Sequence, residues 1–313
     1  MVNKANPSTG INRDLICKRQ NGAHICYYLS MKVELIGSGG WDGLPSVFCR
    51  CSVCQEAAKD LNSKNRRTRP LLKISGNRES FCLDIGPDFR DQSSRFNLEV
   101  DTFFISHWHY DHLFGIYELG GWFGLKLNKK PIIYSSQGTA NYIKEHMSFM
   151  DLDVRVLSAY EPREVGGVIV TPIPMYHMRS QDVNKDHEEL DTLGFIVSDG
   201  QSKIAYLADY YKLPPKTQEL VSQCDAVIAD GTYLLEEKYP NEVFRNALKE
   251  YNDPDHMHGK DIFDFTKSLG SMPVIFHSIT HLPEMTHEDL QKAMPANHHI
   301  GYDGMDITSL LKQ

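Results

Sequence analysis

Residues 100–112 read VDTFFISHWHYDH, and the fold assignment depends on this stretch. Its first seven residues are mostly apolar or β-branched, which predicts a buried strand. His107 and His109 project to the same side of an extended backbone, and the chain then turns to offer Asp111 and His112. Imidazoles and a carboxylate suit zinc, manganese or iron, and this set is more than one tetrahedral ion needs. The stretch therefore predicts two adjacent metal ions.

The spacing His-x-His-x-Asp-His at the end of an apolar strand resembles the signature of the metallo-β-lactamase superfamily. Further segments of residues 31–313 follow in the order of that family. PIPMYHM offers His177, AYLADY offers Asp209, and PVIFHS offers His277. The resemblance implies an α/β fold, the αββα sandwich, in which helices flank two mixed sheets and the metals lie at one edge of the sheets.

The same resemblance implies a ligand set for a binuclear site. One ion would take His107, His109 and His177, the other would take Asp111, His112 and His277, and Asp209 would bridge them. Zinc and manganese both stay open, since His and Asp ligands suit either ion. Such a pair would lower the pKa of a bridging water from about 15.7 toward 7, which makes hydroxide the expected nucleophile.

Two further residues are candidates for catalytic roles beside Asp111. Asp84, in FCLDIGPDFR, matches the superfamily's first motif, where a carboxylate orients a metal-bound histidine; the alternative is a turn residue before Gly86. His258, in DPDHMHGKDIFDF, lies where cyclic phosphodiesterase and RNase Z relatives carry a histidine that contacts the phosphate or protonates the leaving group. The alternative is a solvated loop histidine, and His256 is the expected bystander.

The chain has seven cysteines, and three of them lie within six residues, at Cys49, Cys51 and Cys54. This crowding is poor for disulfides and good for a metal. The pattern resembles the cyclic phosphodiesterases of the carbon–phosphorus lyase pathway (PhnP-like), whose structural zinc is completed by a histidine near the last catalytic one. That points to His281. The family's two histidines are three apart, whereas His277 and His281 are four apart, so His281 as catalytic ligand with His287 as structural ligand stays open.

A second resemblance is to the pyrroloquinoline-quinone biosynthesis protein B. It rests on the cysteine cluster, the Arg67-Thr68 segment, residues 88–90 and the YDGM ending at 302–305. Those features bear on ancestry and fold. That relative has a degraded first metal motif, whereas this chain keeps every ligand type, so the sequence favours hydrolysis over an accessory role.

Local patterns indicate a domain that begins near Met31, after an extension over residues 1–30 with no clean period. Helices are expected near 53–62, 139–147, 215–223 and 259–269. Strands are expected in MKVELIG, LLKIS, SFCLDIG, VDTFFISH, KPIIYSS, GVIVTPIP, LGFIVSD, KIAYLADY, DAVIADG and PVIFHS. Residues 178–192 are a polar insert, which is typical of a long surface loop.

Bulk composition limits the classes of partner. A net charge of −8 and a pI near 5.9 provide no long-range attraction for a polyanion, which disfavours a nucleic-acid substrate. No run of about 18 apolar residues or signal-peptide pattern occurs, so we expect a cytoplasmic protein without a membrane span. A homodimer is a candidate assembly.

The ligand pattern predicts a two-metal hydrolase, and the resemblance to the cyclic phosphodiesterases implies a small phosphate ester, including cyclic ribosyl phosphates, as the leading substrate class. The alternatives are a nuclease, an ester, thioester or lactone hydrolase, and a non-catalytic binding or biosynthetic accessory protein. No Gly-x-Ser-x-Gly motif for a serine nucleophile occurs. The expected cofactors are two divalent ions in the active site and one structural zinc.

Overall fold

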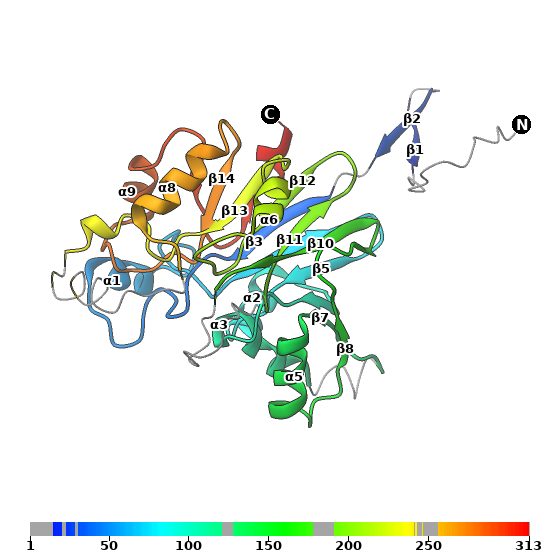
Figure 1. Ribbon diagram of the computed structural model, residues 1–313, viewed down its shortest axis with the longest axis horizontal. Coiled ribbons are helices and arrows are strands. Elements are labelled where there is room, and N and C mark those ends of the chain that lie inside the picture. Colours follow the sequence, from blue (N-terminus) through cyan, green and yellow to red (C-terminus); the bar gives the residue numbers. More distant parts are fainter. Residues whose placement is uncertain are drawn as a thin grey trace, which may run out of the picture.

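The computed structural model describes residues 31–120, 128–177, 191–240, 242, 246 and 256–312, together with the backbone of residues 15–20 and 23–28 (Figure 1). Two seven-stranded sheets form its centre. Sheet one has the spatial order β16 (Met305–Asp306), β3 (Lys32–Gly37), β4 (Leu71–Ser75), β5 (Ser80–Leu83), β6 (Thr102–Phe104), β7 (Ile132–Ser135) and β8 (Asp153–Val156). Sheet two has the order β15 (His298–Ile300), β14 (Val274–His277), β13 (Ala226–Asp230), β12 (Lys203–Tyr206), β11 (Thr192–Ser198), β10 (Val168–Met175) and β9 (Arg163–Val165).

Helices lie outside both sheets. Figure 1 shows α5 beside β7 and β8, and α8 beside β14, while α9 contacts β15. The α-helices are α1 (Ser52–Lys59), α2 (Phe89–Phe96), α3 (Tyr110–Leu113), α5 (Gln137–His146), α6 (Pro215–Val221), α8 (Gly259–Ser268) and α9 (His287–Lys292). The described part of the chain also contains the 3-10 helices η1 (Phe114–Leu119), η3 (Glu236–Lys238) and η4 (Thr308–Lys312).

The side chains of sheet one alternate between two hydrophobic clusters. Phe81 and Leu83 of β5 pack between the sheets, whereas Cys82 packs on the outer side with residues of α2 and α5. Phe103 and Phe104 of β6 divide in the same way. Successive side chains of a strand point to opposite faces, so sheet one buries both of its faces. The expected αββα sandwich is confirmed.

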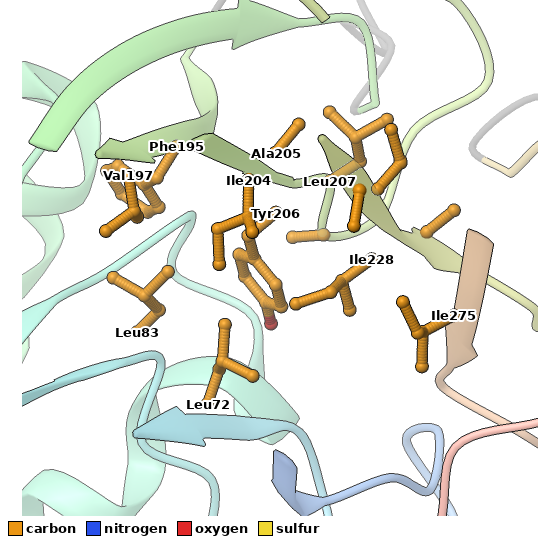
Figure 2. Close-up of a cluster of buried hydrophobic side chains, with 14 of the residues drawn as sticks. Leu72, Leu83, Phe195, Val197, Ile204, Ala205, Tyr206, Leu207, Ile228 and Ile275 are labelled. Carbon is orange, nitrogen blue, oxygen red and sulfur yellow. The ribbon is translucent and has the colours of Figure 1, made fainter. Parts of the chain in front are cut away.

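Figure 2 shows the interior between the sheets, where Leu72 and Leu83 of sheet one face Ile204, Tyr206 and Ile228 of sheet two. All five are fully buried. Burial of one such aliphatic side chain stabilises a fold by about 1.5–3 kcal/mol. The Tyr206 hydroxyl points toward sheet one, so this core also carries a polar link between the layers.

The sheet topology brings several strand ends to one edge. β5 runs parallel to β6, and β12, β13 and β14 run parallel to one another. β10 is two antiparallel steps from β12 and so points the same way. The residues that follow these strands therefore collect at one edge, among them Asp84, His107, His177, Asp209 and Asp230.

The expected helices and strands are present within a few residues of their sequence-based bounds. The N-terminal extension also contains an antiparallel pair of strands, β1 (Leu15–Gln20) and β2 (Ala23–Tyr28), which the sequence-based strand assignment did not include. Asn21-Gly22, a strong hairpin signal, stands between these strands in the sequence. The predicted loop at 178–192 falls outside the described residues except for its last two. Among the described helices, none is long and apolar enough to cross a bilayer.

Candidate metal centre

Three histidines and one aspartate form the first ligand set, with ligand atoms all within 4.8 Å of one another: His107, His109, His177 and Asp209. The Nε2 atoms of His107 and His177 each lie 3.8 Å from Asp209 Oδ2. His177 Nε2 lies 3.1 Å from His109 Nδ1. Ligand nitrogens that point at one carboxylate across such distances leave room for a cation between them.

A second ligand set shares the same carboxylate and adds Asp111 and His112. His112 Nε2 is 3.3 Å from Asp209 Oδ1 and 3.4 Å from Asp111 Oδ2. The two oxygens of Asp209 therefore face different ligand sets, which is the arrangement of a bridging carboxylate.

Three buried polar atoms at the centre have no hydrogen-bond partner among the described residues: Nε2 of His107, Nε2 of His112 and Oδ1 of Asp209. An unsatisfied buried polar atom costs about 1–3 kcal/mol, and natural folds avoid this. These three atoms face one another, and imidazole nitrogen with carboxylate oxygen is a donor set for a divalent ion. The residues present thus fit the two expected cations.

The electrostatics of the centre are consistent with metal ligation. Burial holds the pKa of His107 well below its usual value, which keeps the imidazole in its neutral, ligating form. Burial alone would raise the pKa of Asp209, but His112 and His256 outweigh it and hold that pKa well below its usual value. The shared carboxylate is therefore ionised.

Asp84 orients His112 through Nδ1, the ring nitrogen that does not face Asp209. Its Oδ2 lies 2.8 Å from His112 Nδ1 and accepts a 2.7 Å hydrogen bond from the Tyr206 hydroxyl. Its Oδ1 accepts from the Ser106 backbone N–H at 2.8 Å. A carboxylate on the far nitrogen fixes the imidazole tautomer and aims Nε2 at the ion. Asp84 has a φ of 61°, so the position is held against backbone strain.

The prediction that His277 is a metal ligand does not hold in this structure. Its Nε2 donates to the Leu207 carbonyl at 2.9 Å, and its Nδ1 lies 2.9 Å from the Ser278 hydroxyl, so neither nitrogen is available to a cation. His277 is fully buried and stacks on Tyr206. Ser278, the next residue, lines the active-site cavity instead. Alternate residues at a strand end face opposite ways, so His277 points into the core whereas Ser278 faces the cavity.

His256, expected to be a bystander, lies at the centre. Its Nε2 is 3.9 Å from Asp209 Oδ2, and its Nδ1 is 2.7 Å from Asp230 Oδ2. Asp230 in turn accepts from the N–H and hydroxyl of Thr232. This carboxylate–imidazole relay is the one that orients metal-bound histidines, and Asp209, Asp230 and His256 form a further ligand group. The sequence signal that could have pointed to His256 was its partner Asp230, which ends the apolar strand DAVIAD.

The structure places His258 away from the cavity. Its Nδ1 lies 2.7 Å from Glu236 Oε2, and its ring stacks on Tyr233 with centroids 4.7 Å apart. Tyr233 lines the cavity, whereas His258 is not among the lining residues. The expected phosphate contact or proton transfer by His258 has no support in this geometry.

The cysteine site is assembled as the sequence indicates. The ligand atoms of Cys49, Cys51, Cys54 and His281 lie within 4.8 Å of one another. His281 Nδ1 is 3.4 Å from Cys49 Sγ and 3.7 Å from Cys51 Sγ, while its Nε2 faces Asp42 Oδ2 at 3.0 Å. Backbone N–H groups of Ser46 and Cys54 donate to the sulfurs. Three sulfurs, an imidazole and an orienting carboxylate fit a structural zinc.

The alternative that His287 completes the cysteine site is wrong. His287 begins α9, and its Nδ1 lies 3.2 Å from Nη2 of the buried Arg67. Burial and the nearby Arg67 charge lower the pKa of His287 to about 4. His287 also stands edge-on to Tyr302. It belongs to the packing of the C-terminal segment.

Both centres border a single cavity of about 1070 Å³. His109, Asp111, Asp209 and His256 line it from the binuclear centre, and Asp42 and His281 line it from the cysteine site. Its walls are rich in aromatic side chains: Trp41, Trp108, Tyr110, Phe114, Tyr142 and Tyr233. A small organic molecule could reach the binuclear centre through this space.

Comparison with known proteins agrees with this geometry. Residues 80–299 match the family model of the β-lactamase superfamily domain. The chain belongs to that superfamily. The matched range contains every candidate ligand of the binuclear centre and His281 but begins after the three cysteines.

Two solved structures share the superfamily fold closely. A diphosphatase from the PhnP family has a TM-score of 0.70 and 21% identity, with 89% of this chain and 96% of the other covered. Zn²⁺-bound PqqB from Methylobacterium extorquens has a TM-score of 0.69 and 17% identity, with 88% and 99% covered. These likenesses confirm both expected resemblances at the level of fold.

Two curated relatives also match by sequence. An octanoyltransferase of Porphyromonas gingivalis is 24% identical over 88% of this chain and 51% of its own length, so the chain spans about half of that relative. Coenzyme PQQ synthesis protein B of Methylobacterium radiotolerans is 21% identical over 65% of this chain and 74% of its own length.

We predict that the variants His256→Ala and His277→Ala differ in their affinity for metal ions. Loss of His256 should weaken binding of one ion by at least about tenfold, because it removes an imidazole that points at Asp209. His277→Ala should keep both ions and lower Tm, since it leaves the buried Leu207 carbonyl without its donor. Metal titration by calorimetry on both variants measures this, and an ion lost from His277→Ala alone would restore His277 as the ligand.

A second prediction concerns the cysteine site. His281→Ala should release zinc to a chromogenic chelator much faster than the unmodified protein does, because three thiolates without a fourth ligand form an open site. His287→Ala is the matched control and should retain zinc even if its Tm falls, since His287 packs against Arg67. Equal zinc retention in both variants would contradict the assignment of His281.

Proposed function

We propose that this protein is a two-metal hydrolase of small phosphate esters. The observation that carries the proposal is the bridging position of Asp209, whose two oxygens face separate ligand sets at the wall of a cavity. Paired divalent ions about 3.5–4 Å apart are typical of enzymes that hydrolyse phosphate esters. The diphosphatase of the PhnP family, which shares this fold, supports the same reaction class.

Each ligand has a place in this proposal. His107, His109 and His177 would hold one ion, and Asp111 and His112 the other, with Asp209 shared and His256 placed beside the shared Oδ2. Divalent ions so held supply Lewis acidity, which activates water at neutral pH and polarises a phosphoryl oxygen. Zinc and manganese both suit this donor set.

The chain's own residues provide orientation around the ions. Asp84 holds His112 and Asp230 holds His256, so both imidazoles are fixed in direction before substrate binds. Such preorganisation lowers the reorganisation needed during reaction. The aromatic walls, including the stacked pair Trp108 and Tyr142, would exclude water and seat the organic part of an ester.

Cavity size and charge favour a small substrate over a polymer. The cavity of about 1070 Å³ lies just above the usual range of small-molecule pockets, which is about 300–1,000 Å³. The chain's net charge is −8, which repels a long polyanion. A nuclease is therefore the weaker alternative within the same reaction class.

A second candidate is hydrolysis of an acyl ester or thioester. Two observations favour it: the name octanoyltransferase for a relative that matches 88% of this chain, and the aromatic cavity walls, which suit an apolar acyl group. Against it stands the length of that relative, because about half of it lies outside the match. A third candidate is a non-catalytic accessory role in biosynthesis, because the PQQ synthesis proteins are also relatives.

Turnover of two chromogenic esters by the metal-loaded protein tests the proposal. We expect hydrolysis of bis-p-nitrophenyl phosphate at a kcat/KM at least about tenfold above that for p-nitrophenyl octanoate. Asp111→Asn should retain less than about a tenth of this activity, because it removes an ionised ligand. Asp153→Asn, which alters only an exposed ion pair with Arg155, is the matched control and should be fully active. Faster turnover of the octanoate would favour the acyl alternative, and turnover of neither would overturn the proposal.

A further inference from the structure

Arg69 is the one lysine or arginine among the described residues that line the cavity. The other charged residues of the described lining are carboxylates, apart from the histidines: Asp42, Asp111 and Asp209. Away from the bound ions, the attraction of an anion into this cavity therefore depends on a single side chain.

The guanidinium of Arg69 is held in a fixed position. Its Nη1 lies 3.1 Å from both carboxylate oxygens of Asp88, and its Nε donates to the Trp41 carbonyl at 3.2 Å. Its Cζ lies 5.8 Å from the Tyr110 ring centroid. Gly43 has a φ of +60°, and a Cβ there would come within 3.1 Å of Nη1. The absence of a side chain at Gly43 therefore lets its loop pack against the guanidinium of Arg69.

The hydrogen bonds of Arg69 to described residues leave its Nη2 group available to a ligand. A guanidinium has five N–H donors in a planar fork. Nε and Nη1 have partners, whereas Nη2 has no hydrogen bond to any residue in the described part of the chain. The side chain is 18% exposed, and Arg69 is one of the residues that line the cavity. A donor pair in this setting is suited to a carboxylate or phosphate oxygen.

Arg69 is also adjacent to the binuclear centre. A Cβ on Gly86 would come within 2.5 Å of the Asp111 backbone oxygen and within 2.6 Å of Arg69 Cβ. The absence of a side chain at Gly86 therefore allows the Arg69 segment and the ligand segment to pack against each other. An anionic group bound at the ions would share the cavity with Arg69, its one lysine or arginine among the described lining residues.

We propose that Arg69 is a substrate-binding residue that takes an oxygen of the substrate's anionic group through its Nη2 edge. The proposal rests on the proposed function in that it assumes a phosphate ester. It makes Asp88 a positioning residue, which holds the guanidinium while leaving Nη2 to the ligand. It also restricts the substrate class, because Arg69 is the one lysine or arginine among the described lining residues for negative charge beyond that taken by the ions.

A purely structural ion pair between Arg69 and Asp88 is the competing explanation, and two variants distinguish it. Arg69→Gln removes both the pair and the proposed contact, whereas Asp88→Asn removes the pair's charge but keeps the guanidinium. A structural role predicts that both lower Tm and that neither changes anion affinity. Substrate binding predicts that Arg69→Gln weakens anion binding more than Asp88→Asn does.

The experiment uses the metal-loaded protein, with inorganic phosphate and bis-p-nitrophenyl phosphate as probes. Arg69→Gln should raise the calorimetric Kd for phosphate and the KM for the diester by at least about tenfold, as expected for a charge-assisted hydrogen bond. Its kcat should stay within about threefold, since the contact is also present in the ground state. Arg69→Lys should recover part of the loss, and Arg155→Gln, an exposed arginine outside the cavity lining, should match the unmodified protein.

Unchanged phosphate affinity and KM in Arg69→Gln, with Tm lowered in both Arg69→Gln and Asp88→Asn, would overturn the proposal. So would an equal loss of phosphate affinity in the two variants. If the unmodified protein hydrolyses no phosphodiester, the proposed function fails, and phosphate calorimetry on Arg69→Gln still decides whether Arg69 binds the anion.

Discussion

The site depends on one buried carboxylate, Asp209, that faces imidazoles from several separate segments of the chain. Burial of this charge without compensation would be costly, and the neighbouring His112 and His256 keep it ionised. The unpartnered nitrogens of His107 and His112 point into the same space. A pair of divalent cations would satisfy the carboxylate and the nitrogens together. Metal binding would therefore contribute directly to the stability of this edge of the fold.

The cysteine site and the binuclear centre are linked through the cavity wall. Asp42 faces Nε2 of His281, and both residues line the cavity. Zinc at the cysteines would therefore fix a wall of the substrate space as well as the loop that carries Cys49–Cys54. This arrangement joins a local stability element to substrate binding, since the same segment also supplies the Trp41 carbonyl that holds Arg69.

The sequence was most informative where ligands are local. His107–His112 could be assigned because strand and turn geometry bring these side chains together, and the resemblance to the superfamily then implied His177 and Asp209 at the ends of apolar strands. His277 also ends such a strand, but its direction depends on a one-residue alternation and on the Leu207 carbonyl, which belongs to a distant segment. His256 could not be recognised because its partner Asp230 lies 26 residues away. Long-range hydrogen bonds, which a pattern does not contain, decided both.

Anomalous X-ray diffraction from crystals of the metal-loaded protein tests the central claim most directly. Data collected on both sides of the zinc and manganese absorption edges would locate each ion independently of the protein's activity. The account predicts two peaks on opposite sides of the Asp209 carboxylate, with His256 beside one of them, and a third peak among Cys49, Cys51, Cys54 and His281. A single peak at the binuclear centre, or a peak coordinated by a reoriented His277, would contradict it.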